Sequence, residues 1–229
     1  TGLADARRLA LVVVPAALPV TAAFLDHHRA LGVEHFLCLR LGDAAVPAAA
    51  DVSVLDLGTP DDAGLLAAVN AAAQRWGAGR WLLFLLPHEH LVYPYAESRV
   101  LAELVQHLED DRRSPLHCAV VDLYGGGPPD PAGRPGGDHR FDGWGYVQSA
   151  GRRRSIEIRG GPGLRAFHAE APVSAPRLQR IALVHWRPWY HFVRFRQLAN
   201  PLALNRAHRP GEVSITGALL PMDGGWTAA

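Results

Sequence analysis

Residues 80–95 read Arg-Trp-Leu-Leu-Phe-Leu-Leu-Pro-His-Glu-His-Leu-Val-Tyr-Pro-Tyr. The six residues 81–86 are all apolar, which is typical of a strand buried on both faces of a mainly parallel sheet, and Pro87 should end its pairing. His88, Glu89 and His90 follow at once. Ligands of open α/β sheets bind beyond the carboxyl ends of the strands, so this polar corner is the first candidate for chemistry.

The first half of the chain alternates predicted strands and helices around this central strand. Apolar positions recur at helical spacing between about residues 20 and 31, and Gly32 is a good C-terminal stop for that helix. Alternation of this kind predicts an α/β fold that begins with a right-handed βαβ unit. The other expected strands are 9–14, 35–41, 51–57 and 116–123, and the other expected helices are 62–76, capped within 59–62, and 96–109.

The pattern changes after Tyr124. Residues 125–137 are rich in glycine and proline, which predicts a long surface loop. Short strands are expected at 156–159 and 181–186, and the aromatic spacing of 189–198 predicts a helix. A chain of 229 residues favours one domain, with an α/β half at about 1–124 and a less regular half at about 125–229.

Composition excludes several classes of function. A formal net charge of +1 gives no electrostatic argument for binding nucleic acid. No apolar run reaches the length of a membrane span, and the start of the sequence lacks the pattern of a signal peptide. Cys38 and Cys118 lie in apolar runs, which argues against a disulfide. We therefore expect a cytoplasmic protein whose partner is a small molecule or another protein.

Seven phrases of the sequence carry a family resemblance. Besides residues 81–95, they are LDHHRALGVEHF at 25–36, VDLYGGGP at 121–128, RGGPGLRAF at 159–167, LVHWRPWY at 183–190, NPLALNRAH at 200–208 and SITGALL at 214–220. Taken in their order along the chain, the seven phrases resemble the glycosyltransferase family 2 proteins of the bacterial family 2-like branch. The resemblance covers almost the whole chain. It implies a GT-A-like fold: a doubly wound, mainly parallel nucleotide-binding half followed by an irregular α+β acceptor half.

The same resemblance implies a donor site from which this sequence departs. A carboxylate pair of DxD type is expected after the central strand to hold a divalent cation, but the matching positions are Leu86 and His88, and only Glu89 is acidic. Arg40 stands where a carboxylate would hold the nucleotide base. Magnesium and manganese need oxygen ligands beside a diphosphate, so standard nucleotide-sugar transfer is a poor expectation here.

His88 and His90 suggest a different metal site. Residues two apart on a strand point to the same side, so two imidazoles could meet one ion while Glu89 faces away or bridges. The candidate cofactor is a divalent zinc, iron, nickel or manganese ion, and a third ligand would be needed. The alternative is that two polar side chains close a strand and bind nothing. Candidates for the third ligand are Asp122, His185 and His191.

Each of the remaining candidate residues has a possible functional role and a possible structural role. Asp122 and Asp142 join Glu89 as candidate catalytic groups, although a strand-end carboxylate also caps amides and an aspartate before glycine also forms turns. Arg40 and Leu86 mark the donor side. The aromatic cluster near residue 186 could stack on a sugar or could pack a helix on the sheet. The candidate acceptor-binding residues are Tyr124, Arg159, Trp186 and Trp189.

Three functions are consistent with these observations. The first is a glycosyltransferase-like enzyme with an altered metal corner, in which His88, Glu89 and His90 hold a cation and an aspartate acts as base. The second is a catalytically inactive pseudoglycosyltransferase that serves as a binding or assembly module. The third is a repurposed metal-dependent enzyme that uses His88 and His90.

Overall fold

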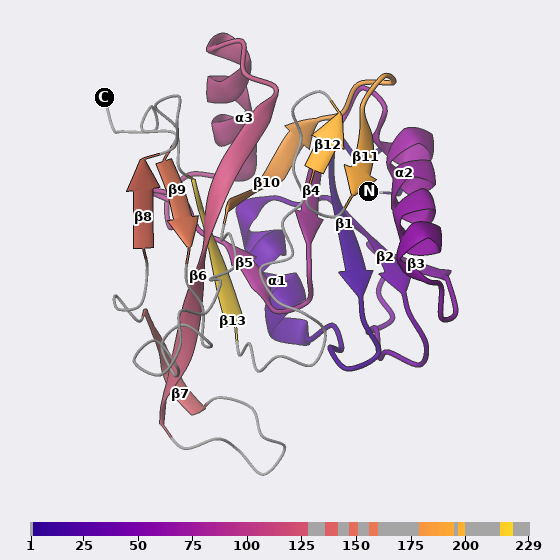
Figure 1. Cartoon of the computed structure of the whole chain (residues 1–229). Coiled ribbons are helices and arrows are strands. Elements are labelled where there is room, and N and C mark those ends of the chain that lie inside the picture. Colours follow the sequence, from indigo (N-terminus) through magenta and orange to yellow (C-terminus); the bar gives the residue numbers. More distant parts are fainter. Residues whose placement is uncertain are drawn as a thin grey trace.

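The computed structural model describes residues 2–127, 136–141, 147–150, 156–159, 179–194, 197–199 and 216–221 (Figure 1). Within these ranges, side chains are described for 2–116, 118 and 181–192. The chain is an α/β protein with three described helices and one large mixed sheet. Among those helices, none is long and apolar enough to cross a bilayer.

The N-terminal half forms a doubly wound parallel unit. Its four strands lie in the order β3-β2-β1-β4, and all of their pairings are parallel. Helix α1 packs on one face of these strands and α2 on the other, each against its own core cluster. Helices on both faces bury β1, β2 and β4, which explains the apolar runs of these three strands, whereas the edge strand β3 is partly exposed. The bounds are β1 Arg8–Val14, α1 Ala22–Leu31, β2 His35–Arg40, β3 Val52–Asp56, α2 Asp62–Gly77 and β4 Trp81–Leu85.

The rest of the sheet is largely antiparallel. Beyond β4 the order is β10-β6-β13-β5, with β7 also paired to β6. Only β5 and β13 are parallel in this part, so the expectation of a mainly parallel sheet holds for the first four strands and is wrong for the whole. The bounds are β5 Glu89–Leu91, α3 Leu101–Asp110, β6 Pro115–Gly127, β7 Gly136–Phe141, β10 Gln179–His185 and β13 Thr216–Pro221.

The helix ends follow local sequence chemistry. The Thr21 hydroxyl accepts a hydrogen bond from the Phe24 amide at 3.1 Å and caps the start of α1. Gly32 ends α1 in the left-handed region, with φ of 96°, as expected. The Asp61 carboxylate caps α2 by accepting from the Gly64 amide at 2.7 Å. These ends were predictable because each depends on residues within one turn.

Two predicted elements were wrong. Residues 189–198 do not form a helix: after a turn, β11 (His191–Arg194) pairs with β12 (Gln197–Ala199). The predicted loop at 125–137 is shorter than expected, because β6 extends to Gly127 and β7 begins at Gly136, and these two glycines pair. Residues 128–135 of that loop lie outside the described residues. The remaining expected strand, β9 (Ile156–Arg159), is present and pairs with β8 (Val147–Ala150).

Candidate functional site

The polar corner after β4 is a tight turn closed by its own glutamate. The Glu89 amide donates to the Leu86 carbonyl at 3.0 Å, and the Leu86 amide donates to Glu89 Oε2 at 2.7 Å. Glu89 is 0% exposed. One carboxylate oxygen therefore serves the backbone of the turn, and the side chain is shielded from solvent.

The two histidines of the corner do not belong to one strand. His88 lies in the turn, whereas His90 is the middle residue of β5. The alternation that would put both imidazoles on one side applies only within an extended strand. The reason for the change is Pro87, which ends β4 and lets the chain reverse before β5 begins. The predicted His88–His90 pairing therefore loses its geometric basis.

Instead, His90 lies beside two histidines of α1. Its ring centroid is 4.9 Å from that of His27 and 5.9 Å from that of His28, and the His28 and His90 planes are nearly parallel at 20°. His27 and His28 are themselves 4.8 Å apart. Sequence reasoning did not predict this cluster. The adjacent His27 and His28 are visible in the sequence as a possible site, but their contact with His90 of β5 depends on how α1 packs against that strand.

The α1 histidines are bonded to the backbone. His27 Nε2 lies 2.8 Å from the Leu91 carbonyl, and His28 Nδ1 lies 2.8 Å from the Phe24 carbonyl. The Leu91 amide donates to His28 Nε2 at 3.4 Å. His28 is 0% exposed, and this burial, with a further contribution from His27, lowers its pKa well below the ordinary value of 6.5. His28 is therefore neutral in the folded protein near pH 7.

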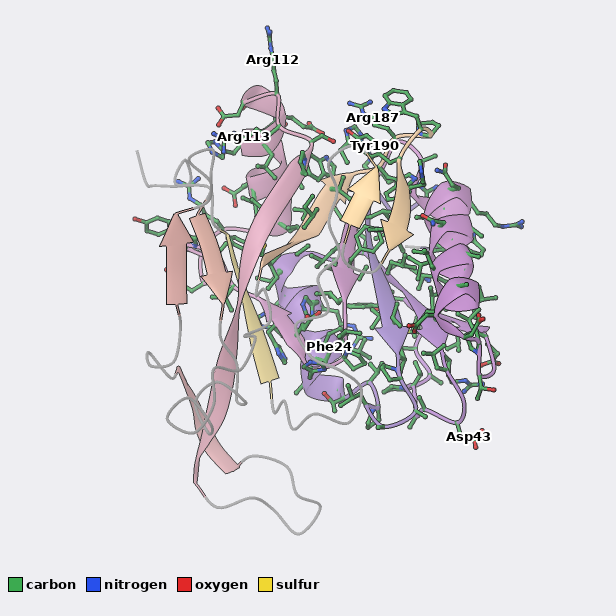
Figure 2. All side chains as sticks on the ribbon, in the orientation of Figure 1. Phe24, Asp43, Arg112, Arg113, Arg187 and Tyr190 are labelled. Atoms are coloured by element: carbon green, nitrogen blue, oxygen red, sulfur yellow. The ribbon has the colours of Figure 1, made fainter. Side chains whose placement is uncertain are left out.

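The donor-side candidates occupy the same end of the sheet. Arg40 ends β2, and its Nε donates to the carboxylate of Asp56, which is its register partner in β3. This hydrogen bond raises the pKa of the guanidinium, with Asp43 adding to the effect. Asp43 lies at the lower end of the sheet in Figure 2. Leu86 is half-buried in the turn after β4 and offers no oxygen ligand.

The backbone brings Asp122 close to Glu89. Gly217 of β13 pairs with Asp122 of β6 on one side and with Glu89 of β5 on the other. Two strand spacings put the two backbone positions about 10 Å apart. Tyr124 is also in β6, opposite Arg140. Arg159 is in β9, in a separate two-stranded sheet. Asp142 lies outside the described residues.

The aromatic candidates lie at the opposite end of the sheet. β10 runs antiparallel to β4, so His185 and the residues after it sit at the amino end of β4. Figure 2 shows Arg187 and Tyr190 at the upper end, far from Phe24 and Asp43. Trp186 is 0% exposed and packs on Phe84 and Phe192, whereas Trp189 is 64% exposed. The structure does not bring these tryptophans to the polar corner.

Two candidate third ligands for a metal lie away from the polar corner. The His185 ring stacks on Trp81 with centroids 5.4 Å apart, at the amino end of β4. His191 is exposed on β11, which packs on α2, and α2 covers the face opposite to α1 and His90. In the part of the chain that the structure describes, no group of three or more His, Cys, Asp or Glu is arranged to hold a metal ion.

Fold and site together define an α/β protein with a mixed sheet and a polar corner closed on its own backbone. Comparison with family models, with curated proteins and with solved structures found no match for this chain. The family resemblance therefore rests on the seven sequence phrases alone.

Proposed function

We propose that this chain is a glycosyltransferase family 2-like protein whose GT-A-like scaffold serves as a binding or assembly module and does not carry out metal-dependent transfer from a nucleotide sugar. The strand order β3-β2-β1-β4, with helices on both faces, supports the scaffold part of the proposal. Such a doubly wound unit commonly forms nucleotide sites at the carboxyl ends of its strands. Fold alone does not carry function, so the chemistry of that edge decides.

The position of Glu89 carries the proposal. Its carboxylate is the one acidic group left in the corner, and Oε2 accepts the hydrogen bond of the Leu86 amide. A cation that bridges a diphosphate needs oxygen ligands that face the diphosphate. Leu86 supplies none, and Glu89 is 0% exposed. The residues present therefore do not fit a magnesium or manganese site of the DxD type.

The base-binding position gives independent support. Arg40 stands where the resemblance implies a carboxylate, and it is paired with Asp56. A guanidinium cannot accept the hydrogen bonds that a carboxylate accepts from a base. To meet a phosphate instead, Arg40 would have to give up part of its pairing with Asp56. Two positions of the donor site have thus lost the required chemistry.

One observation favours a second candidate, a metal-dependent enzyme with a rebuilt corner. The His27 and His90 rings are 4.9 Å apart, which is compatible with two imidazoles near one zinc, iron or nickel ion. In that case the ion would activate water or a small acid, as divalent transition metals do. Asp122 would be the nearby candidate base from β6. The absence of a three-residue ligand group among the described residues makes this the weaker candidate.

A thermal-shift panel tests the proposal directly. Untagged protein would be scanned with nucleoside diphosphates and nucleotide sugars, each with manganese, zinc, nickel or iron. A ligand at a hundred times its Kd stabilises by about 2.7 kcal/mol, which is readily measured. We expect no shift with any nucleotide. A manganese-dependent shift with a nucleotide would contradict the proposal, and a shift with zinc or nickel alone would favour the second candidate.

Restoring the corner provides the sharper experiment. The double variant Leu86→Asp, His88→Asp rebuilds the DxD pattern, and Leu86→Asn, His88→Asn is the matched control without charge. If the scaffold derives from a family 2 transferase, the first variant should gain manganese-dependent binding of a nucleoside diphosphate, and the control should not. If the two folded variants bind a nucleoside diphosphate equally in the presence of manganese, the resemblance no longer supports a donor site at this corner.

A further inference from the structure

Leu91 has both of its backbone polar groups bonded to histidines of α1. Its carbonyl is 2.8 Å from His27 Nε2, and its amide donates to His28 Nε2 at 3.4 Å. β5 is the last strand in the sheet order and pairs only with β13 within the described sheet. The edge of such a strand leaves backbone groups without a ladder partner, and buried groups of this kind must be bonded elsewhere. The two imidazoles perform this role for Leu91.

We propose that His27 and His28 form a positioning pair that holds β5 on α1 through opposite neutral tautomers. A carbonyl accepts only from an N–H, so His28 carries its proton on Nδ1, toward Phe24, and His27 carries its proton on Nε2, toward Leu91. The Leu91 amide needs a lone pair, which His28 Nε2 provides. The backbone thus selects a different tautomer for each of two adjacent histidines.

The pair fixes the polar corner as well as Leu91. His90 immediately precedes Leu91, and its ring stacks on His28 and meets His27 edge-on. Glu89 begins the same three-residue strand. Moving β5 would therefore move the carboxylate that closes the turn at Leu86. Both ring nitrogens of His28 are engaged, so His28 positions the corner and is not a metal ligand.

This inference does not depend on the proposed function, because it concerns bonds within the chain. The first test is a long-range ¹H–¹⁵N correlation of the histidine rings, recorded about two pH units above the ordinary pKa so that neutral rings report their tautomers. We expect an Nδ1–H signature for His28 and an Nε2–H signature for His27. An Nε2–H tautomer at His28 would overturn the proposal.

Hydrogen exchange provides a second, independent test. In His28→Leu the Leu91 amide loses its acceptor, and we expect its exchange to accelerate at least tenfold, together with the amides of Glu89 and Leu86. The Phe36 amide, which donates to the Asp51 carbonyl in another part of the sheet, should be unchanged. Unchanged exchange at Leu91 in a folded variant would contradict the proposal.

A matched substitution separates this role from general burial of a histidine. His35 is also buried, at 2% exposure, and its Nε2 lies 2.9 Å from the Ser53 hydroxyl. His35→Leu should leave exchange at Leu91 and the tautomer of His28 unchanged. If His28→Leu does not fold, His27→Leu tests the same strand, since it removes the ring N–H that meets the Leu91 carbonyl and supplies no other donor. Equal acceleration at Leu91 in the His35 variant would count against the pair.

Discussion

Two short strands of this protein are held on helices by the same device, made from different side chains. On one face of the sheet, His27 and His28 of α1 bond the carbonyl and the amide of Leu91 in β5. On the other face, Asn70 of α2 donates to the Phe192 carbonyl at 2.8 Å and accepts from the Phe192 amide at 2.6 Å. The single side-chain amide of Asn70 therefore bonds the backbone of β11 in the way that two imidazoles bond the backbone of β5.

The difference between the two devices is their response to protons. An Asn side chain does not titrate in the range where proteins are stable, whereas an imidazole that accepts a hydrogen bond loses its acceptor when it is protonated. The imidazole device is also more deeply buried: His28 is 0% exposed, whereas Asn70 is only partly buried. Polar side chains in a corner can also have their hydrogen-bonding groups occupied by the backbone, as those of Glu89 and His28 show. Their presence alone is therefore weak evidence for catalysis.

Among substitutions of the polar side chains, the largest effect is expected where the corner is closed. Glu89→Leu leaves the half-buried Leu86 amide without its acceptor beside the fully buried Glu89 position and should destabilise the protein by about 3 kcal/mol. Glu89→Gln keeps an acceptor oxygen and should cost about 1 kcal/mol. Urea unfolding of both variants gives the comparison. Equal losses in the two variants would contradict the role of a Glu89 side-chain oxygen as the acceptor that closes the turn.

A smaller loss is expected at the opposite device. Asn70→Leu removes both bonds to Phe192 and should lower the free energy of unfolding by about 2 kcal/mol, because the site is only partly buried. Asn70→Asp keeps the acceptor for the Phe192 amide and should lose less. The check is urea unfolding combined with exchange at the Phe192 amide, which should accelerate in the leucine variant and stay slow in the aspartate variant.

The pH dependence should separate the two devices. The folded pKa of His28 is lowered, so below about pH 6.5 the unfolded chain takes up a proton that the folded chain excludes. The free energy of unfolding should therefore fall as the pH falls below this value, by at most about 1.4 kcal/mol per pH unit for this group. His28→Leu should flatten this slope, and Asn70→Leu should not. Identical slopes of the free energy of unfolding with pH in the two variants would contradict a specific role of His28 in this pH dependence.

The smallest effect is expected at the exposed tryptophan beside the Asn70 device. Trp189 is 64% exposed, and its ring meets Tyr190 edge-on at 6.2 Å. Trp189→Ala should change stability by less than about 0.5 kcal/mol, as for most surface positions. Trp186→Ala should cost about 4 kcal/mol, since that ring is fully buried. Thermal unfolding of the two variants would show whether the two tryptophans differ as their burial indicates.

Much of the first half of the fold could be predicted from local signals. The apolar run at β4, the Thr21 cap and the Gly32 stop of α1 act within a few residues, so the sequence contains their cause. The helix predicted at 189–198 was wrong because Asn70, more than a hundred residues earlier, bonds both backbone groups of Phe192 and holds an extended strand there. A distant partner of this kind leaves no periodic pattern.

The sequence predicted where the polar corner lies along the chain, but not which partners its residues have. The sequence by itself determined that a buried strand ends in a polar corner, and that Glu89 is the acidic residue of this corner. Only the tertiary structure decided that Glu89 closes its own turn, that His90 meets His27 and His28, and that Trp186 lies at the other end of the sheet. The physical reason is that residue types are fixed locally, whereas their partners depend on which strands and helices come together.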